Sequence, residues 1–365
     1  MTQTIRDSSN PDRKNMASNP FPPDFQPKKI VVRVCNWIGD VVMNLPALEV
    51  LRAHYPNAEI AAVARPWVRS LLDLRRDLVD RCIDFDDRGK HRGTLGFLRF
   101  CRSLRDEGFE AAFVFTNHLK GALMMRLAGV PIRVGFANGE TRWFLNRRLS
   151  RKAIPKARHQ FHRYLDLLAA VGIESDKRRP PKLMPDQAQI EAAEAKFLSN
   201  LRRPLLSVHA GAAYGTAKRW LPDRYGEVCR RFLEEQGGTV VLLGVIPEKD
   251  TNDTIAVAAA HERLLNLCGK TGLGESIAII AASDGFLSND SGLMHVAAAL
   301  GIPQVAVFGP TDVNATYPAN PRARMLFHPV PCSPCFKRHC PIGHDCMVGM
   351  GTDRVWKAVG QLFSS

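Results

Sequence analysis

A polar turn between two apolar segments constrains the fold of this chain more than any other feature. Residues 285–308 read as an apolar segment, the turn Asn-Asp-Ser-Gly, an Ala-rich apolar run and a second apolar segment. Ser291 is placed to cap a helix formed by the Ala-rich run. The first backbone N–H groups of that helix would point into the turn, those of Gly292, Leu293 and Met294. The pattern predicts a βαβ unit whose turn attracts anions, at the sheet edge where α/β folds bind ligands.

Strand and helix patterns alternate along the rest of the chain. In the first half, short β-rich runs occur at 29–35, 59–64, 81–84, 111–115 and 133–135. In the second half they occur at 204–208, 239–243, 264–266, 285–288 and 304–308. Helical patterns separate these runs, so we predict an α/β protein with two Rossmann-like domains, each built on a doubly wound parallel sheet. The loops that follow the strands would face a central cleft between the domains.

Pattern and composition divide the 365 residues into five parts. The parts are a tail at 1–28, an N-terminal domain at 29–172, a linker with a connecting helix at 173–203, a C-terminal domain at 204–350 and a C-terminal helix at 351–365. The tail is rich in Pro, Asn and Ser, and we expect it to be disordered. It has no apolar core typical of a signal peptide, and no run of about 18 uncharged apolar residues appears. These observations predict a cytoplasmic protein without a membrane span.

The charge balance is basic, with 50 Lys and Arg against 36 Asp and Glu, a net charge of +14. Such a balance suits nucleic acid, an anionic membrane or a phosphorylated substrate. The segment 141–165 carries cations and no acidic residue, and its cations are Arg142, Arg147, Arg148, Arg151, Lys152, Lys156, Arg158 and Arg163. Aromatic residues are not interleaved as base stacking needs, and no motif supports nucleic acid as a partner. The segment is either a face that meets another polyanion or a solvated basic surface.

Nine cysteines occur in a chain with no export signal, which argues against a disulfide framework. Four of them cluster near the C-terminus together with His339 and His344, namely Cys332, Cys335, Cys340 and Cys346. This spacing fits a structural zinc ion or free thiols, and the spacing alone does not decide between them. No G-x-G-x-x-G fingerprint is present, so no dinucleotide cofactor is expected.

Two further positions carry residues suited to chemistry. Asp40 follows the first strand and lies at the start of the predicted helix 41–54. It is either an ordinary helix cap or a partly desolvated general base. The loop 209–218 combines small residues with Lys218, beside Arg219, which suits a diphosphate through backbone N–H donors and a cation. The alternative is a surface lysine near a helix start.

Four motifs resemble the ADP-heptose:lipopolysaccharide heptosyltransferases, glycosyltransferase family nine. They are Asn-Trp-Ile-Gly-Asp at 36–40, Ala-Lys-Arg-Trp at 217–220, Ser-Asn-Asp-Ser-Gly-Leu-Met-His at 288–295 and Phe-Gly-Pro-Thr at 308–311. The cysteine-containing stretch 331–344 is similar to the heptosyltransferase II branch. The resemblance implies a GT-B fold with no cofactor. It also implies a metal-independent, inverting transfer of heptose from ADP-L-glycero-D-manno-heptose to an inner-core sugar of lipid A–Kdo.

The resemblance also assigns roles to individual residues. Asp40 matches the catalytic base, and Lys218 matches a lysine that contacts the pyrophosphate and acts in catalysis. The candidate donor-binding set is Gly39, Thr216, Lys218, Glu248, Asp290, Ser291, Gly292 and His295. For the acceptor we take cations of the basic segment, Arg142, Arg147 and Arg148, and we expect no metal ligand. A polyanionic acceptor in the inner leaflet also predicts peripheral association with the inner face of the inner membrane.

Two alternatives to this function stay open at this level. One is a non-catalytic GT-B-like protein that binds an anionic glycolipid, and the other is a family member with a related nucleotide-sugar donor. Binding alone needs no base, so the presence of both Asp40 and Lys218 favours an enzyme over the first alternative.

Overall fold

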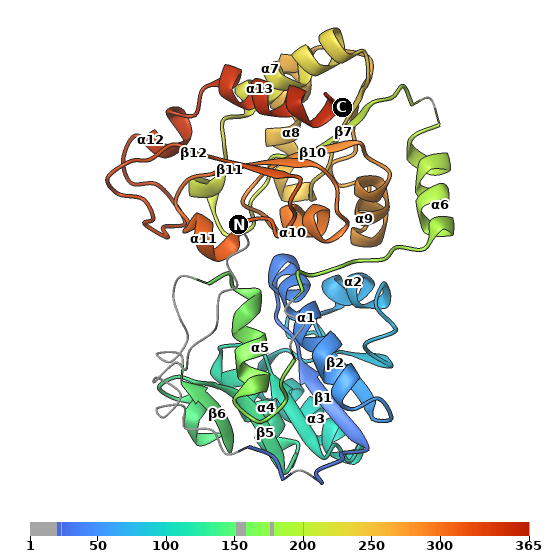
Figure 1. Ribbon diagram of the computed structural model, residues 1–365, viewed down its shortest axis with the longest axis vertical. Helices are drawn as coiled ribbons and strands as arrows, with labels where there is room; N and C mark the ends of the chain where they lie inside the picture. The colour runs from blue at the N-terminus through green and yellow to red at the C-terminus, as the bar shows by residue number, and fades with distance from the viewer. Residues whose placement is uncertain (1–19, 23, 151–157, 176–178, 200, 365) are drawn as a thin grey trace, which may run out of the picture.

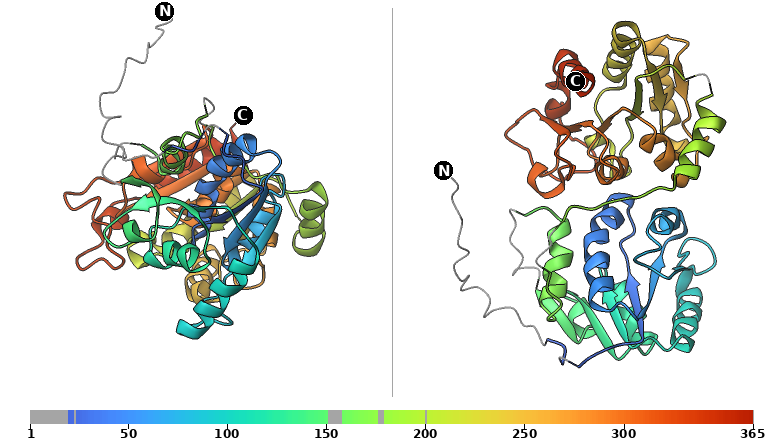
Figure 2. Two further views of the ribbon diagram at one scale, coloured as in Figure 1. Left: turned by 90° about the horizontal axis from the view of Figure 1, so that it is seen from below. Right: turned by 45° about the vertical axis from the view of Figure 1, so that its right-hand side comes forward.

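The computed structural model describes residues 20–22, 24–150, 158–175, 179–199 and 201–364. It contains two six-stranded parallel sheets, one in each half of the chain, and helices cover both faces of each sheet (Figure 1). The two halves are stacked along the long axis of the molecule, and residues 179–186 run beside their contact to the connecting helix α6 (Figures 1 and 2). The predicted fold class is therefore confirmed.

The N-terminal sheet has the strand order β3-β2-β1-β4-β5-β6. Its strands are β1 Lys29–Arg33, β2 Glu59–Ala64, β3 Arg81–Asp84, β4 Ala111–Val114, β5 Ile132–Ala137 and β6 Arg147–Ser150. Val31 in the central strand pairs with Ala61 on one side and Ala112 on the other. The direction of strand addition reverses between β1 and β4, and α/β sheets bind ligands beyond the carboxyl ends of the strands at such a point.

Helices cover this sheet on both sides. One side carries α1 Ile38–His54, α2 Arg69–Asp73 and α5 Phe161–Ala169, and the other carries α3 Gly93–Asp106 and α4 Leu119–Leu127. Helix α3 shows why these segments are helical. Its buried residues Phe97, Phe100, Cys101 and Leu104 recur at the spacing that places them on one face of a helix. Short 3-10 turns are η2 Pro66–Val68 and η3 Thr141–Trp143.

The C-terminal sheet repeats the same topology, with the order β12-β11-β10-β7-β8-β9. Its strands are β7 Leu205–His209, β8 Thr239–Leu242, β9 Leu264–Asn266, β10 Gly285–Asn289, β11 Gln304–Phe308 and β12 Ala323–Phe327. The switch point of this sheet lies between β7 and β10. The donor-site motifs predicted from the sequence follow these two strands, at their carboxyl ends.

The helices of the C-terminal half are also divided between two faces. The outer face carries α7 Pro222–Arg231, α8 Lys249–Ala259 and α13 Thr352–Phe363, and the face toward the N-terminal half carries α9 Leu273–Ala281 and α10 Gly292–Ala299. Helix α6 Gln187–Phe197, in the connection, packs on α9. Shorter elements are α11 Val313–Thr316, α12 Asp345–Val348, the 3-10 turns η5 Thr216–Lys218 and η7 Ile246–Glu248, and the π-helical turn η6 Phe232–Gln236.

The two halves contact each other directly through the N-terminal ends of α1 and α10. A Cβ atom on Gly39 would lie 2.7 Å from Cδ2 of His295, and one on Gly292 would lie 3.0 Å from Cβ of Ile38. One backbone hydrogen bond also crosses the contact, from the Gln160 N–H to the Ala315 carbonyl at 2.9 Å, and in the linker the Leu183 N–H donates to the Ala299 carbonyl of α10 at 3.0 Å. Apolar residues from both halves share one core cluster at this contact. Glycine at both contact positions is what allows the helices to approach this closely.

The structure differs from the sequence-based expectations at several elements. Strands β6 and β12 were not predicted. Both are only partly buried edge strands, and arginines interrupt their apolar residues. Helix α1 begins at Ile38 and not at residue 41, and its N-cap is Trp37. Asp40 is therefore no helix cap but lies in the first turn. Within the predicted tail at 1–28, Phe21 and Phe25 pack against the core of the N-terminal half.

In the part of the chain that the structure describes, no helix is both long enough and apolar enough to cross a membrane.

Candidate active site

Asp40 lies where the two halves meet, in the first turn of α1. Its Oδ1 accepts a hydrogen bond of 2.7 Å from the Gln160 side-chain amide, just before α5. Burial raises the pKa of the Asp40 carboxyl above its usual range, whereas the Gln160 hydrogen bond lowers the pKa. The positive charges of Lys218 and Arg163 also lower the pKa of Asp40. A partly buried carboxylate with a raised pKa has the properties of a general base.

In the C-terminal half, Lys218 is part of a hydrogen-bonded group of side chains. Its Nζ donates to Oδ2 of Asp290 at 2.6 Å, and the Thr311 hydroxyl donates to the same oxygen at 2.7 Å. The side chain of Asp290 is 4% exposed and that of Lys218 is 15% exposed. Three of the four sequence motifs therefore join in one hydrogen-bonded group. In this arrangement Asp290 holds the lysine in place.

The start of α10 has the geometry that the sequence predicts. The Ser291 hydroxyl caps the helix and accepts a hydrogen bond from the Met294 N–H at 3.3 Å. The Met294 N–H is therefore occupied by the cap, which corrects the expectation that it points freely into the turn. Gly292 begins the helix beside Asp290 and against α1. The helix start places partial positive charge at the contact between the two halves.

His295, in the next turn of α10, is buried against Gly39. Burial lowers the pKa of His295 to about 4, and burial likewise lowers the pKa of His159 to about 4. Both imidazoles are therefore neutral at neutral pH. His159 donates through Nε2 to the Tyr317 carbonyl at 2.8 Å, which ties the two halves together. Neither ring supplies a positive charge for an anionic ligand.

Two further predicted donor residues lie at the carboxyl edge of the C-terminal sheet. Glu248, after β8, is buried and accepts a hydrogen bond from the Val245 N–H at 3.1 Å. Its carboxylate lies against Gly211, which follows β7, and a Cβ atom there would collide with it. Thr216 is exposed in η5, and its hydroxyl forms a hydrogen bond of 3.0 Å with Nδ1 of His339.

The cysteine-rich segment, residues 331–346, packs on the loop that carries Lys218. The His344 ring donates to the Ala217 carbonyl at 2.8 Å, and the Ala217 N–H donates to the Arg338 carbonyl at 3.0 Å. A Cβ atom on Gly215 would collide with the backbone of Arg338. None of the nine cysteines forms a disulfide. Among the described residues no group of three or more His, Cys, Asp or Glu side chains is placed to hold a metal ion.

The predicted acceptor residues lie at the β6 edge of the N-terminal sheet, whereas Asp40 lies in α1. Arg142 is exposed in η3, and its guanidinium lies 4.7 Å from the centre of the Trp143 ring. Arg148, on edge strand β6, is exposed and donates to the Arg142 carbonyl at 2.9 Å. Arg147, also on β6, is half-buried. Other cations of the basic segment, Arg151, Lys152 and Lys156, lie outside the described residues.

Sequence reasoning missed Gln160, Thr311 and Asn289 as parts of this site. Asn289, fully buried at the end of β10, accepts from the Trp220 N–H at 2.9 Å and donates to the Ala210 carbonyl at 2.6 Å. It therefore fixes the Lys218 loop to the β10 turn. Asn289 and Thr311 lie inside quoted motifs, so the motifs were a signal for them. Gln160 lies in a basic segment, and nothing local marks it as a partner of Asp40.

Comparison with known proteins agrees with this geometry. Residues 97–345 match the family model described as glycosyltransferase family 9 (heptosyltransferase). The chain is 34% identical over 311 residues to lipopolysaccharide heptosyltransferase 2 of Escherichia coli strain K12. The aligned region covers 82% of this chain and 87% of that protein. It is 30% identical over 305 residues to lipooligosaccharide heptosyltransferase 2 of Haemophilus influenzae, covering 80% of this chain and 86% of the relative.

Solved structures give the same result. The structure of E. coli ADP-heptose LPS heptosyltransferase II matches with a TM-score of 0.76 at 29% identity, covering 92% of this chain and 98% of that chain. A glycosyltransferase family 9 structure from Veillonella parvula has a TM-score of 0.82 at 22% identity, with 94% and 99% covered, and shares the fold. The architecture is thus the GT-B fold of glycosyltransferases. Within that class, the chain belongs to glycosyltransferase family 9, the heptosyltransferases, as the motifs indicate.

The Lys218–Asp290 pair allows a test that separates stability from chemistry. Lys218→Met leaves a buried carboxylate without its cation, which costs about 3–5 kcal/mol of unfolding free energy. The double variant Lys218→Met/Asp290→Asn removes both charges and should recover most of the melting temperature. If Lys218 acts on the leaving group as the motif predicts, kcat should stay reduced by about 10²–10³, because its charge is still missing. A double variant that regains both stability and kcat would show that Lys218 is only structural.

Gln160 allows a test of the Asp40 assignment through pH. The Gln160 amide favours the ionised carboxylate, so Gln160→Leu should raise the pKa of Asp40 further. A base must be ionised to act, so the acid limb of the kcat/KM profile should move to higher pH, with less effect on the plateau. The exposed Gln189→Leu is the matched control and should leave the limb in place. An acid limb that is unchanged or moves to lower pH in Gln160→Leu contradicts the assignment.

Proposed function

We propose that this chain is an inverting heptosyltransferase of lipopolysaccharide core assembly. Its donor would be ADP-L-glycero-D-manno-heptose, and its acceptor would be a heptosyl-Kdo₂-lipid A type of precursor. The proposal draws on the relatives, which are heptosyltransferases 2 by name, and on the geometry around Asp40. The observation that carries it is the partly buried Asp40 carboxylate on one half, whose pKa is lowered by the charge of Lys218, which Asp290 holds on the other half.

Asp40 would act on the acceptor. The acceptor hydroxyl oxygen forms the new bond to C1 of the heptose, and its proton passes to the Asp40 carboxylate. Because Gln160 holds Oδ1, Oδ2 is the oxygen that would take the proton. The raised pKa of Asp40 makes it a stronger base than a solvated carboxylate.

Lys218 and the start of α10 would act on the donor. As the new bond forms on one face of C1, the bond from C1 to the diphosphate oxygen breaks on the opposite face, and the electron pair leaves with ADP. The negative charge that develops on the diphosphate is stabilised by the Lys218 ammonium and by the backbone N–H groups at Gly292. These groups supply the charge that a divalent cation would otherwise supply.

The division of labour between the halves follows from these positions. We assign the acceptor to the half at 29–172, which carries Asp40, and the donor to the half at 204–350, which carries Lys218. Glu248 lies at the carboxyl edge of the donor half, at a place where its carboxylate would accept hydrogen bonds from the ribose hydroxyls of ADP. Thr216 would contact the donor only if its bond to His339 is exchanged for one to the ligand.

The proposal is tested by mixing the protein with ADP-heptose and a heptosyl-Kdo₂-lipid A precursor in buffer with EDTA. Release of ADP should require the acceptor, and the acceptor should gain one heptose by mass spectrometry. Asp40→Asn should lower kcat by about 10²–10⁴ with donor affinity retained. Donor binding without acceptor-dependent ADP release would favour a non-catalytic glycolipid-binding protein, and turnover of another ADP-sugar in preference would favour a related donor.

We further propose peripheral association with the cytoplasmic face of the inner membrane through the basic segment. Arg142 and Arg148 are exposed beside each other. Each cation near an anionic surface contributes about 1 kcal/mol, so Arg142→Gln/Arg148→Gln should weaken binding to anionic vesicles about tenfold or more, as measured by sedimentation.

The matched control for the membrane is Arg324→Gln, an exposed arginine on β12, the corresponding edge strand of the other sheet. It should bind anionic vesicles as the unaltered protein does, and high salt should release the unaltered protein from them. Equal vesicle binding by Arg142→Gln/Arg148→Gln and the unaltered protein would contradict the membrane proposal.

A further inference from the structure

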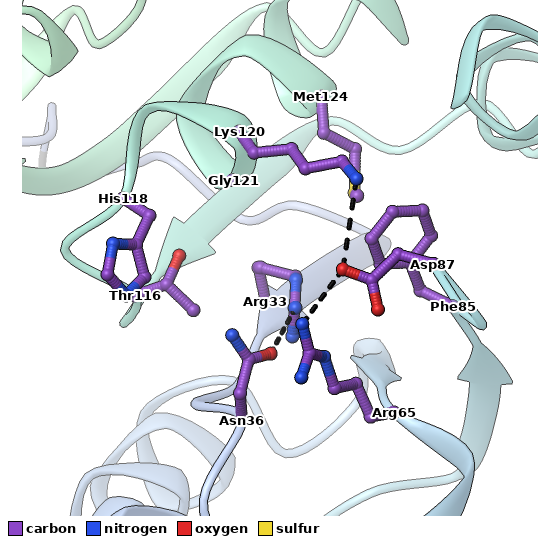
Figure 3. A pocket seen from close by; sticks show the side chains of 10 residues that line it. All are labelled: Arg33, Asn36, Arg65, Phe85, Asp87, Thr116, His118, Lys120, Gly121 and Met124. Carbon is purple, nitrogen blue, oxygen red and sulfur yellow. Dashed lines mark hydrogen bonds and ion pairs between the residues drawn. The ribbon is translucent and has the colours of Figure 1, made fainter. Parts of the chain in front are cut away.

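A cavity of about 130 Å³ opens at the carboxyl edge of the N-terminal sheet (Figure 3). Its walls come from the ends of four strands and from the start of α4. Arg33 ends β1, Arg65 follows β2, Asp87 follows β3, and Lys120 lies in the first turn of α4. A water molecule needs on the order of 10–15 Å³ on this measure. The cavity therefore admits a group of several non-hydrogen atoms, such as a carboxylate or a phosphate.

The charge of the cavity is positive. Three cationic side chains line it, those of Arg33, Arg65 and Lys120, against the single carboxylate of Asp87. Arg65 donates to Oδ2 of Asp87 at 2.8 Å, and the Lys120 ammonium lies 3.8 Å from the same oxygen. Figure 3 shows these groups converging on the cavity. The Asp87 carboxylate neutralises one of these three cations, so positive charge remains for an anionic ligand to neutralise.

The buried arginine is the most unusual of these groups. Arg33 is 4% exposed, and burial lowers the pKa of its guanidinium to about 10. Its Nη atoms donate to Asn36 Oδ1 at 2.6 Å and to the Val63 carbonyl at 3.1 Å, neither of which carries a charge. A guanidinium buried without a direct carboxylate partner is costly. An anion in the cavity would offset that cost.

Several buried polar atoms around the cavity have no hydrogen-bond partner among the described residues. They are Nε of Arg33, Nε of Arg65, Oδ1 of Asp87 and Oγ1 of Thr116. Thr116 is 6% exposed and follows β4. Buried polar groups in proteins are almost always paired, so a cluster of unpaired ones at a cavity is characteristic of a site that a polar ligand completes.

The position of the cavity relates it to Asp40. Asn36 lines the cavity, and the chain then enters α1, whose first turn carries Asp40. Four residues reach at most about 14 Å, so the two places lie within the length that an oligosaccharide acceptor spans. Both lie in the same half and beyond the carboxyl ends of its strands. The exposed basic edge at Arg142 and Arg148 is a different surface.

We propose that this cavity binds an anionic oxygen group of the acceptor, a carboxylate or a phosphate, and thereby fixes the acceptor relative to Asp40. The inference rests on the proposed function, since it names how that acceptor is held. Lys120 and Arg65 contact the anion at the mouth, and Arg33 binds it from below. The acceptor residues are then these three cations, and the edge arginines serve the membrane surface.

Lys120→Gln tests this proposal, because Lys120 is exposed on the rim and its replacement should leave the fold intact. A charge-assisted hydrogen bond is worth about tenfold or more in binding, so KM for the acceptor should rise at least about tenfold. The donor KM should stay within about twofold. Arg65→Gln should act in the same direction. The matched control is Lys90→Gln, an exposed lysine in the loop after β3 that does not line the cavity.

Two acceptors separate the possible anions. One is a heptosyl-Kdo oligosaccharide that keeps its carboxylates and has no phosphate, and the other is the complete phosphorylated precursor. A raised KM for both in Lys120→Gln assigns the cavity to a carboxylate, and a raised KM for the precursor alone assigns it to a phosphate. An unchanged KM for both acceptors, or an equal rise in Lys90→Gln, overturns the proposal.

A failure of the proposed function would be recognised separately. If the unaltered protein transfers no heptose, calorimetric titration with the same two acceptors decides the inference without turnover. Binding that weakens about tenfold or more in Lys120→Gln and stays intact in Lys90→Gln supports an anion-binding cavity. Equal binding of each acceptor by Lys120→Gln, Lys90→Gln and the unaltered protein, including no binding at all, overturns it.

Discussion

The close approach of α1 and α10 is the contact on which the rest of the site depends. Gly39 and Gly292 meet there, and a Cβ atom on either would lie 2.7 or 3.0 Å from a side chain of the other half, so two helix N-termini face each other closely. Each N-terminus carries partial positive charge, and two facing each other repel. The Asp40 carboxylate in the first turn of α1 reduces that repulsion, and an anionic ligand between the helices would reduce it further. The same contact brings Asp40 of one half close enough to Lys218 of the other half for the lysine charge to lower the pKa of Asp40.

Asp290 organises the other half of the site. One of its oxygens accepts from both Lys218 and Thr311, so a single buried carboxylate joins the loop after β7, the turn after β10 and the turn after β11. Asn289 beside it ties the β10 turn to the Trp220 backbone. Polar residues in a motif are often read as ligand contacts. Here Asp290 and Asn289 hold the surrounding elements together, and Lys218 is the residue that we propose faces the donor.

Sequence reasoning succeeded where the deciding interactions are local. The Ser291 cap and the βαβ unit around it depend on neighbouring residues, so both were predicted correctly. The start of α1 was placed too late because Trp37, an uncommon N-cap, precedes it. The Lys218–Asp290 pair and the Asp40–Gln160 hydrogen bond join residues far apart in the chain, and no local pattern encodes them. The cavity lined by Arg33, Arg65 and Lys120 could not be predicted for the same reason, because the sheet brings these residues together from three separate segments of the chain.

The central claim is that glycine at position 39 lets the two halves close far enough for the base and the donor site to act together. The most direct measurement is the kcat of Gly39→Ala, since its new methyl group would lie 2.7 Å from Cδ2 of His295. A displacement of the base by about 1 Å costs up to about 10²-fold in rate, so kcat should fall at least about tenfold while ADP affinity is retained. Gly139→Ala, with open space around it, is the control. A kcat in Gly39→Ala equal to that of Gly139→Ala would contradict the account.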